Sequence, residues 1–333
     1  MKIIFDSISD QSGANIWTQR MSKYLKDVRI DTEIRNHSLF YQFIRPFHFR
    51  KQTYPDNTVQ HTNSWSGWSL KTDLPQVITE HTAVHQSDLD AYKTRGQRAY
   101  HAVIRKYEAK SVLCADKVIC VSRFSQDCLE KTFGYPDSQV IYNGVDTQVF
   151  QPISLLDSPY RMYPDKILIL FVGNLTLLKG AELLPRIMDL LDDRFILLTV
   201  HGFKQKMKIS HKRIINIGTL PEIEMVKIYN ACDIFLSPSR LEGFGLSVAE
   251  AMACGKPVVS MNCSSLPELV VDGKGGFLCG IDNIREFADH IQYLAGEPDE
   301  RKRMGRFNRE KVEEKFTLEQ MVKNYIRVYK LLI

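Results

Sequence analysis

Short apolar segments alternate with longer amphipathic segments along nearly the whole of this 333-residue chain. In the first half we predict strands at residues 2–6, 57–61, 76–80, 117–122 and 140–142. Helices are predicted between them, at residues 15–27, 86–113 and 122–132. Strands that alternate with helices favour parallel sheets with right-handed crossover connections.

The pattern restarts after a proline-containing stretch at residues 152–164, which we interpret as a linker between domains. Strands are predicted at 166–172, 195–200, 214–217, 234–236 and 257–260, and helices at 181–191, at 221–231 and over most of the chain from 283. The repeated pattern predicts an α/β protein with two doubly wound domains that face each other across a cleft.

The composition is that of an ordinary globular protein, with 44% hydrophobic and 25% charged residues. The net charge of +5 is too small to indicate nucleic-acid binding. Seven scattered cysteines without a Cys-x-x-Cys pair indicate reduced thiols, as in a cytoplasmic protein. Residues 1–6 are predicted as a strand rather than a signal peptide, and no apolar run is long enough to span a bilayer.

Two glutamates, Glu242 and Glu250, lie on either side of a glycine-rich turn in the segment 239–259. Backbone N–H groups at such a turn, with the positive end of the following helix, suit an anionic ligand. Each carboxylate can also accept hydrogen bonds from hydroxyl groups. The segment therefore predicts a sugar or ribose site beside a phosphate site, and the alternative is a surface loop with an acid at a helix start.

Lys179 lies in the loop that follows the first predicted strand of the second half. In doubly wound sheets ligands bind outside the carboxyl ends of the strands, and a lysine there suits a diphosphate. The polar loop at residues 9–13 has the corresponding place in the first half. The Gly-x-Gly-x-x-Gly fingerprint and the Walker lysine loop are both absent, which argues against a nicotinamide dehydrogenase and against phosphoryl transfer of the Walker type.

His81 follows a predicted strand and His61 stands similarly after Thr-Val-Gln at the end of another, so the same rule places them at the ligand edge of the first sheet. Histidine can bond sugar hydroxyls or transfer protons, although a lone histidine is more often structural. Asp88 and Asp90 resemble a metal-binding pair, but no third ligand is apparent, and we interpret them as acids at a helix start. We therefore expect no metal site.

Residues 36–72 contain many aromatic and basic side chains without clear periodicity, and the helix at 92–110 carries six basic residues. Such segments could contact a glycan, a lipid headgroup or a partner protein. A packed loop and a solvated helix face are the alternatives.

Four segments together resemble the retaining glycosyltransferases of family 4, also called group 1. They are 239–259, 173–180, Val-Ile-Tyr-Asn-Gly-Val-Asp-Thr-Gln-Val-Phe at 140–150, and Val-Ile-Cys-Val-Ser at 118–122. The resemblance covers most of residues 110–320 and is looser over residues 1–110. It implies the GT-B fold, in which two Rossmann-like domains face a central cleft. It also implies an acceptor-binding domain at 1–152, a donor-binding domain at 165–316, and a last helix, about 317–333, that packs back on the first domain.

By position, the resemblance implies that Glu250 holds the ribose hydroxyls of a nucleotide-sugar donor and that Glu242 lies beside the transferred sugar. The hydroxyls of that sugar would be bound by the backbone amides of Phe244, Gly245 and Leu246. Lys179 would hold the diphosphate, helped by the loop that ends at Gly13, and His81 would lie near the reactive carbon of the sugar. These roles make His81, Lys179 and Glu242 the candidate catalytic residues.

Asn174 also belongs to the donor-binding loop. It departs from the family pattern, because the family usually has an arginine at this position, paired with Lys179. An asparagine keeps a hydrogen-bond donor but loses the charge, so we expect a weaker grip on phosphate or a charge supplied elsewhere. Arg123 and Arg240 are the candidates for that charge.

The implied reaction is the transfer of a hexosyl group from a nucleotide-diphosphate sugar to a glycan or lipid-linked acceptor, with retention of configuration and without a metal or other cofactor. We expect such an enzyme in the cytoplasm, in polysaccharide biosynthesis, with no nucleic-acid partner, and we leave open a peripheral contact with the inner face of the membrane. Two alternatives are a nucleotide-sugar epimerase or hydrolase of the same fold and an inactive glycan-binding or scaffold protein. The sugar, the nucleotide and the acceptor also stay open.

Overall fold

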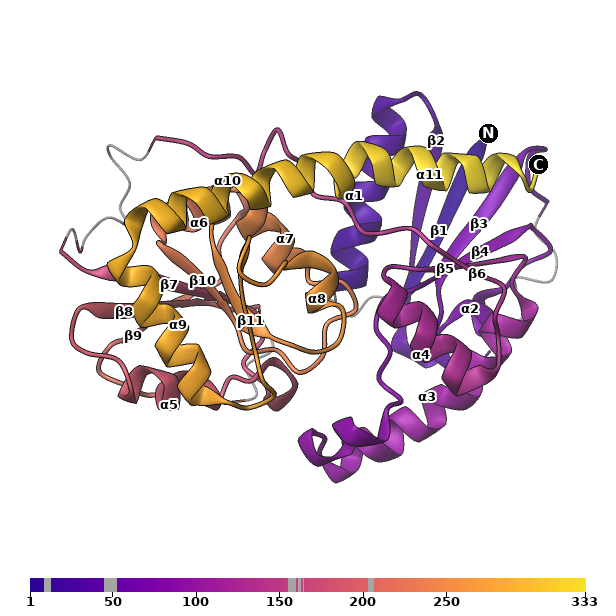
Figure 1. The fold of residues 1–333 in the computed structure, drawn as a ribbon. Coiled ribbons are helices and arrows are strands. Elements are labelled where there is room, and N and C mark those ends of the chain that lie inside the picture. The colour runs from indigo at the N-terminus through magenta and orange to yellow at the C-terminus, as the bar shows by residue number, and fades with distance from the viewer. Residues whose placement is uncertain (9–12, 45–52, 155–159, 161–162, 164, 203–206) are drawn as a thin grey trace. The chain divides into compact units, whose positions relative to one another are not determined.

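The computed structural model describes residues 1–8, 13–44, 53–154, 160, 163, 165–202 and 207–333. The chain divides into two compact units, and each is built around one six-stranded parallel sheet (Figure 1). The first unit comprises Met1–Tyr142 and Glu319–Ile333, and the second comprises Asn143–Leu318. Two parallel α/β sheets confirm the fold class that the alternating pattern predicted.

The strands of the first unit follow the order β2-β1-β3-β4-β5-β6. They are β1 (Lys2–Ile8), β2 (Asp31–His37), β3 (Thr58–Asn63), β4 (Gln76–Glu80), β5 (Lys117–Cys120) and β6 (Ser138–Val140). The helices and 3-10 segments are α1 (Gly13–Asp27), η1 (Leu39–Gln42), α2 (Gly67–Leu70), η3 (Ser87–Tyr92), α3 (Arg95–Cys114), α4 (Arg123–Phe133) and α11 (Leu318–Lys330). Strands β1 and β4 are buried almost throughout, as expected of a parallel sheet that is covered on both faces.

The strands of the second unit follow the order β12-β11-β10-β7-β8-β9. They are β7 (Ile167–Val172), β8 (Phe195–Val200), β9 (Ile214–Gly218), β10 (Ile234–Ser237), β11 (Val258–Met261) and β12 (Gly276–Cys279). Between and after them lie η5 (Leu177–Lys179), α5 (Leu183–Asp189), α6 (Glu222–Ala231), α7 (Leu246–Ala253), α8 (Leu266–Leu269), α9 (Ile284–Gly296) and α10 (Pro298–Lys315). The neighbours β10 and β7 are parallel, so the loops that follow them leave the same edge of the sheet.

Two strands and one helix boundary differ from the prediction. Strand β2 has mostly polar residues and is half-exposed at the edge of its sheet, so it lacks an apolar signal, and β12 has only four residues. The single helix predicted at 86–113 is wrong, because η3 ends before α3 begins. Thr94 starts α3 with a capping box, in which its hydroxyl accepts from the Gln97 amide and the Gln97 side chain accepts from the Thr94 amide.

Residues 143–152 belong to the second unit because their contacts lie there. The amide of Val145 donates to the Phe316 carbonyl at 2.8 Å, and its own carbonyl accepts from the amide of Leu318 at 2.9 Å. The buried ring of Phe150 packs edge-on against Tyr229, with ring centroids 6.0 Å apart.

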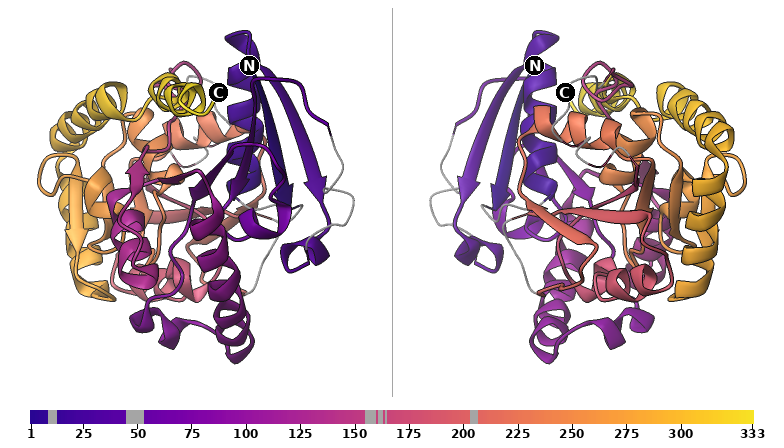
Figure 2. Two further views of the ribbon diagram at one scale, coloured as in Figure 1. Left: turned by 90° about the vertical axis from the view of Figure 1, so that its right-hand side faces the viewer. Right: turned by 90° about the vertical axis from the view of Figure 1, so that its left-hand side faces the viewer.

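The C-terminal helix α11 packs on the first unit, beside α1 and the strands (Figure 1), and both chain termini lie close together in that unit (Figure 2). Two of its tyrosines are fully buried and make specific bonds. The Tyr325 hydroxyl lies 3.0 Å from the Thr79 hydroxyl, and the Tyr329 hydroxyl lies 2.6 Å from Nδ1 of His61. Within the residues that the structure describes, no helix has the length and apolar composition needed to cross a bilayer.

We predict that Tyr329→Phe destabilises the first unit by about 1–3 kcal/mol, because the buried Nδ1 of His61 loses its partner. Urea unfolding followed by fluorescence measures this difference. Tyr293→Phe is the matched control, because Tyr293 is 46% exposed. Equal unfolding midpoints for the two variants would contradict the prediction.

Candidate functional site

The loop after β7 delivers Lys179 to the carboxyl edge of the second sheet. The 3-10 turn η5 is followed by Gly180, which adopts the left-handed conformation with φ of 65°. A Cβ atom on Gly180 would lie 2.0 Å from the carbonyl oxygen of Pro238, so only glycine permits this approach. The loop is thereby held against the end of β10.

Lys179 and Glu242 meet at this edge. The Lys179 ammonium lies 2.5 Å from Oε1 of Glu242, and the lysine side chain stays 29% exposed. The backbone of Glu242 is fixed on both sides, because its amide donates to the Ser264 hydroxyl at 3.1 Å and its carbonyl accepts from the Ser265 hydroxyl at 3.0 Å. The structure therefore brings these two predicted residues together in one contact.

Helix α7 begins immediately after this contact, at the glycine-rich turn. Gly245 has a φ of 96°, and no side chain caps the start of the helix. The first amides of a helix have no intrahelical acceptor, so Leu246 and its neighbours present N–H groups. Phe244 is buried and packs edge-on against Phe316, which anchors the turn. The geometry suits a ligand that is rich in oxygen atoms.

Glu250 lies in the second turn of α7 and is 8% exposed. The hydroxyl of the fully buried Tyr229 donates to its Oε2 at 2.9 Å. This bond orients the carboxylate. Sequence reasoning missed Tyr229, because nothing in its local pattern distinguishes it from an ordinary core tyrosine.

Asn174 and the two arginines named with it lie in different surroundings. The exposed Asn174 has its amide oxygen beside the backbone of Gly202. Arg240 is buried and pairs with Glu182 and Asp282 at 2.5 and 2.7 Å. Arg123 is exposed at the start of α4 in the first unit. Arg240 is therefore already neutralised by carboxylates.

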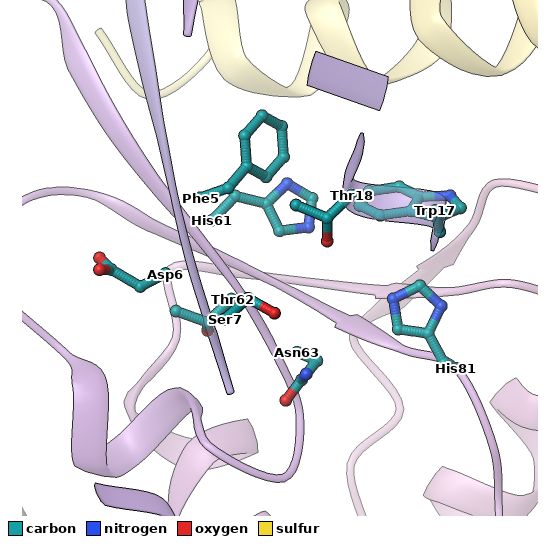
Figure 3. Close-up of a pocket in the computed structure, with 9 residues that line it drawn as sticks. All are labelled: Phe5, Asp6, Ser7, Trp17, Thr18, His61, Thr62, Asn63 and His81. Atoms are coloured by element: carbon teal, nitrogen blue, oxygen red, sulfur yellow. The ribbon is translucent and has the colours of Figure 1, made fainter. Parts of the chain in front are cut away.

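His81 and Gly13 belong to the first unit. Gly13 is the exposed first residue of α1, and residues 9–12 of the predicted phosphate loop lie outside the described residues. His81 follows β4 and lines a small pocket with Trp17, whose ring centroid lies 5.1 Å away, while Thr62 and Asn63 lie across from them (Figure 3). Burial lowers the pKa of His81 to about 4, so at neutral pH it is a neutral imidazole that can donate one hydrogen bond and accept another.

His61 has a structural role in the same region. Its Nδ1 bonds Tyr329 and its Nε2 lies 2.8 Å from the Thr79 hydroxyl. Burial, together with the smaller effect of the nearby His81, lowers its pKa to about 3. Nδ1 is thus committed to α11 and Nε2 to the neighbouring strand β4.

Behind His81 lies a buried acidic pair, Glu80 and Glu108. Glu108 accepts from the Ser64 hydroxyl at 2.9 Å and lies 2.6 Å from Nε2 of His85, while Glu80 accepts from the amide of Thr82 at 2.9 Å. Burial raises the pKa of Glu80 well above its usual value, and the nearby Glu108 raises it further. Burial beside Glu108 therefore favours the protonated form of Glu80.

Acidic, histidine and cysteine side chains form no cluster able to hold a metal ion among the residues that the structure describes. Asp88 and Asp90 lie in the first turn of η3, and Asp90 pairs with Lys93 at 2.8 Å.

Two family models match this chain and together span most of it. Residues 28–149 match the model described as Glycosyltransferase Family 4, and residues 156–311 match the model described as Glycosyl transferases group 1. The chain belongs to the family 4, or group 1, glycosyltransferases.

Curated relatives of this glycosyltransferase align over most of its length. An uncharacterized glycosyltransferase of Methanocaldococcus jannaschii is 28% identical, over 78% of this chain and 69% of the relative. A D-inositol 3-phosphate glycosyltransferase of Thermobifida fusca is 29% identical over 74% and 63%, and an alpha-maltose-1-phosphate synthase of Mycolicibacterium smegmatis is 27% identical over 82% and 79%. The alignments with the first two therefore span about two thirds of those proteins.

Solved structures confirm the GT-B fold of this glycosyltransferase. Sucrose-phosphate synthase from Thermosynechococcus elongatus superposes with a TM-score of 0.81 at 19% identity, covering 100% of this chain and 99% of that one. Anabaena HepE in complex with UDP-glucose gives 0.79 at 17% identity, with full coverage of both chains.

In the natural protein, burial of Glu80 makes the folded state less stable as pH rises. We predict that Glu80→Gln abolishes this pH dependence. A carboxyl group whose pKa is raised by folding stabilises the folded state below its unfolded pKa, near 4.5, and this contribution is lost as pH rises toward the folded pKa. Glutamine cannot ionise, so the variant should gain stability relative to the natural protein between pH 5 and pH 8. The gain is about 1.4 kcal/mol for each pH unit of the shift that lies within this range.

Urea unfolding of both proteins at the two pH values measures the difference. Glu130→Gln, on the exposed face of α4, is the control. A stability difference for Glu80→Gln that is the same at pH 5 and pH 8 would disprove the assignment.

Proposed function

We propose that this glycosyltransferase moves a hexosyl group from a nucleotide-diphosphate sugar to a glycan or lipid-linked acceptor, with retention of configuration. The observation that carries the proposal is the contact between Lys179 and Glu242 beside the uncapped start of α7. A partly exposed cation, a carboxylate and the amides at the start of a helix that no side chain caps match a phosphate next to a sugar.

In the proposed reaction the bond between the anomeric carbon and the diphosphate oxygen breaks, and a bond to the acceptor oxygen forms on the same face. The proton of the acceptor hydroxyl passes to the leaving phosphate. Negative charge that builds on this phosphate is stabilised by Lys179 and by oriented amides at the start of α7, which also bind the sugar hydroxyls. In this proposal Lys179 and the amides supply that stabilisation without a metal ion.

In this proposal the remaining residues bind other parts of the substrates. Glu250, oriented by Tyr229, accepts hydrogen bonds from the ribose, and the neutral His81 bonds a hydroxyl of the transferred sugar. An anionic lipid-linked acceptor would find complementary charge on α3, whose only carboxylate, Glu108, is buried. The exposed charged residues of α3 are all basic, namely Arg95, Arg98, Arg105, Lys106 and Lys110.

Nucleotide release separates this reaction from its alternatives. Release of nucleotide from UDP-glucose, ADP-glucose or GDP-mannose only when an acceptor is added supports transfer. Acceptor-independent turnover would instead indicate an epimerase or hydrolase, and binding without turnover would indicate a scaffold protein.

We predict that Lys179→Ala lowers kcat about 10²- to 10³-fold, because the leaving phosphate loses its cation. The measurement is nucleotide release with the donor and acceptor that the natural enzyme uses. Lys274→Ala removes an exposed lysine from the same unit and should leave the rate unchanged. A rate near that of the natural enzyme in Lys179→Ala would rule out the assigned role.

We predict that Glu250→Ala removes recognition of the ribose specifically. Calorimetry with UDP and with 2′,3′-dideoxy-UDP tests this directly. The natural protein should bind UDP about 10-fold or more tightly than the dideoxy compound, as expected for lost charge-assisted hydrogen bonds. The variant should bind the two equally, and preserved discrimination in the variant would contradict the role.

A further inference from the structure

Arg240 lies between β10 and Glu242, and its side chain is only 4% exposed. Its Nη2 is 2.5 Å from Oε1 of Glu182 and 2.7 Å from Oδ1 of Asp282, and its Nε donates to the same Asp282 oxygen at 2.7 Å. Two carboxylates therefore surround one guanidinium. Its charge is balanced within the protein, which leaves little of it for a phosphate ligand.

The same arginine holds the loop that carries Lys179. Its Nη1 donates to the carbonyl of Leu177, and its backbone amide donates to the carbonyl of Leu178 at 2.9 Å. The turn η5 has only three residues, and its own hydrogen bonds, from the amides of Lys179 and Gly180, are local, so the two bonds from Arg240 tie it to the loop after β10. Gly180 supports the other side of Lys179 through its close contact with Pro238.

We propose that Arg240 is a positioning residue, which holds the loop so that Lys179 reaches both Glu242 and the donor diphosphate. Glu182 and Asp282 orient the guanidinium for this task. The inference rests on the proposed role of Lys179 at the diphosphate. It also means that Arg240 does not supply the positive charge that is missing at Asn174.

The proposal is tested by substitutions of Arg240 that change the geometry of its side chain and either keep or remove its positive charge. Arg240→Lys keeps the charge, but one ammonium cannot bond two carboxylates and a carbonyl in the planar geometry of arginine. We expect Arg240→Lys and Arg240→Met to lose about the same factor, 10- to 100-fold in kcat/KM for the donor. Glu182→Gln and Asp282→Asn should each lower kcat/KM as well. The exposed Arg285→Lys in α9 is the matched control and should behave like the natural enzyme.

The opposite results would overturn the proposal. If Arg240 supplied charge to the phosphate, Arg240→Lys would stay active, and Glu182→Gln or Asp282→Asn would tighten binding of UDP by releasing the arginine. These two acid-to-amide variants keep side-chain volume, so they test the proposal even if the arginine variants fold poorly.

A double-mutant cycle distinguishes positioning through Lys179 from a general structural effect. In a Lys179→Ala background, Arg240→Lys should cause little further loss of kcat/KM, because the group that it positions is gone. Additive losses would overturn the proposal.

Unchanged activity in Arg240→Lys together with a severe loss in Lys179→Ala would overturn this inference alone. A natural enzyme that neither binds UDP, ADP or GDP nor turns over their sugars would overturn the proposed function as well.

Discussion

The contact between Lys179 and Glu242 depends on the parallel pairing of β7 with β10. Because both strands end at the same edge of the sheet, the loops that follow them lie side by side, although 63 residues separate the two side chains along the chain. A glycine at position 180 permits the closest approach of these loops, and serines before α8 fix the backbone of Glu242. Lys179 and Glu242 are therefore placed by sheet topology, by one close backbone contact and by the two serine hydroxyls.

Four neighbouring strands, β12, β11, β10 and β7, contribute loops to this edge. Asp282 follows β12, Ser264 follows β11, Arg240 follows β10 and Lys179 follows β7. Hydrogen bonds and ion pairs join these loops to one another. A change in one loop should therefore act on the others, which is the physical basis for treating Arg240 as part of the machinery that positions the lysine.

The first unit shows the effect of burial on ionisable groups. His61 and His81 are kept neutral by removal from water, and Glu80 is held toward its protonated form beside Glu108. His61 lies within β3, Glu80 ends β4 and His81 follows it, so the buried parallel sheet that carries these side chains also removes them from water. At neutral pH the two histidines are consequently neutral hydrogen-bonding groups.

Local patterns in the sequence predicted the two parallel sheets, most of their strands and the family. Apolar periodicity, Ser122 at the start of α4 and the glycine-rich turns are all signals that a short stretch of sequence contains. They also named Lys179, Glu242 and Glu250 as residues of the second sheet edge. The same patterns did not predict β2 and β12, whose signals are weak, and they predicted η3 and α3 as one helix across Thr94. Only the tertiary structure decided that Tyr229 orients Glu250, that Arg240 is neutralised by Glu182 and Asp282, and that α11 fixes His61. Those contacts join residues from 21 to 268 positions apart, and no local pattern encodes which distant loops a folded sheet brings together.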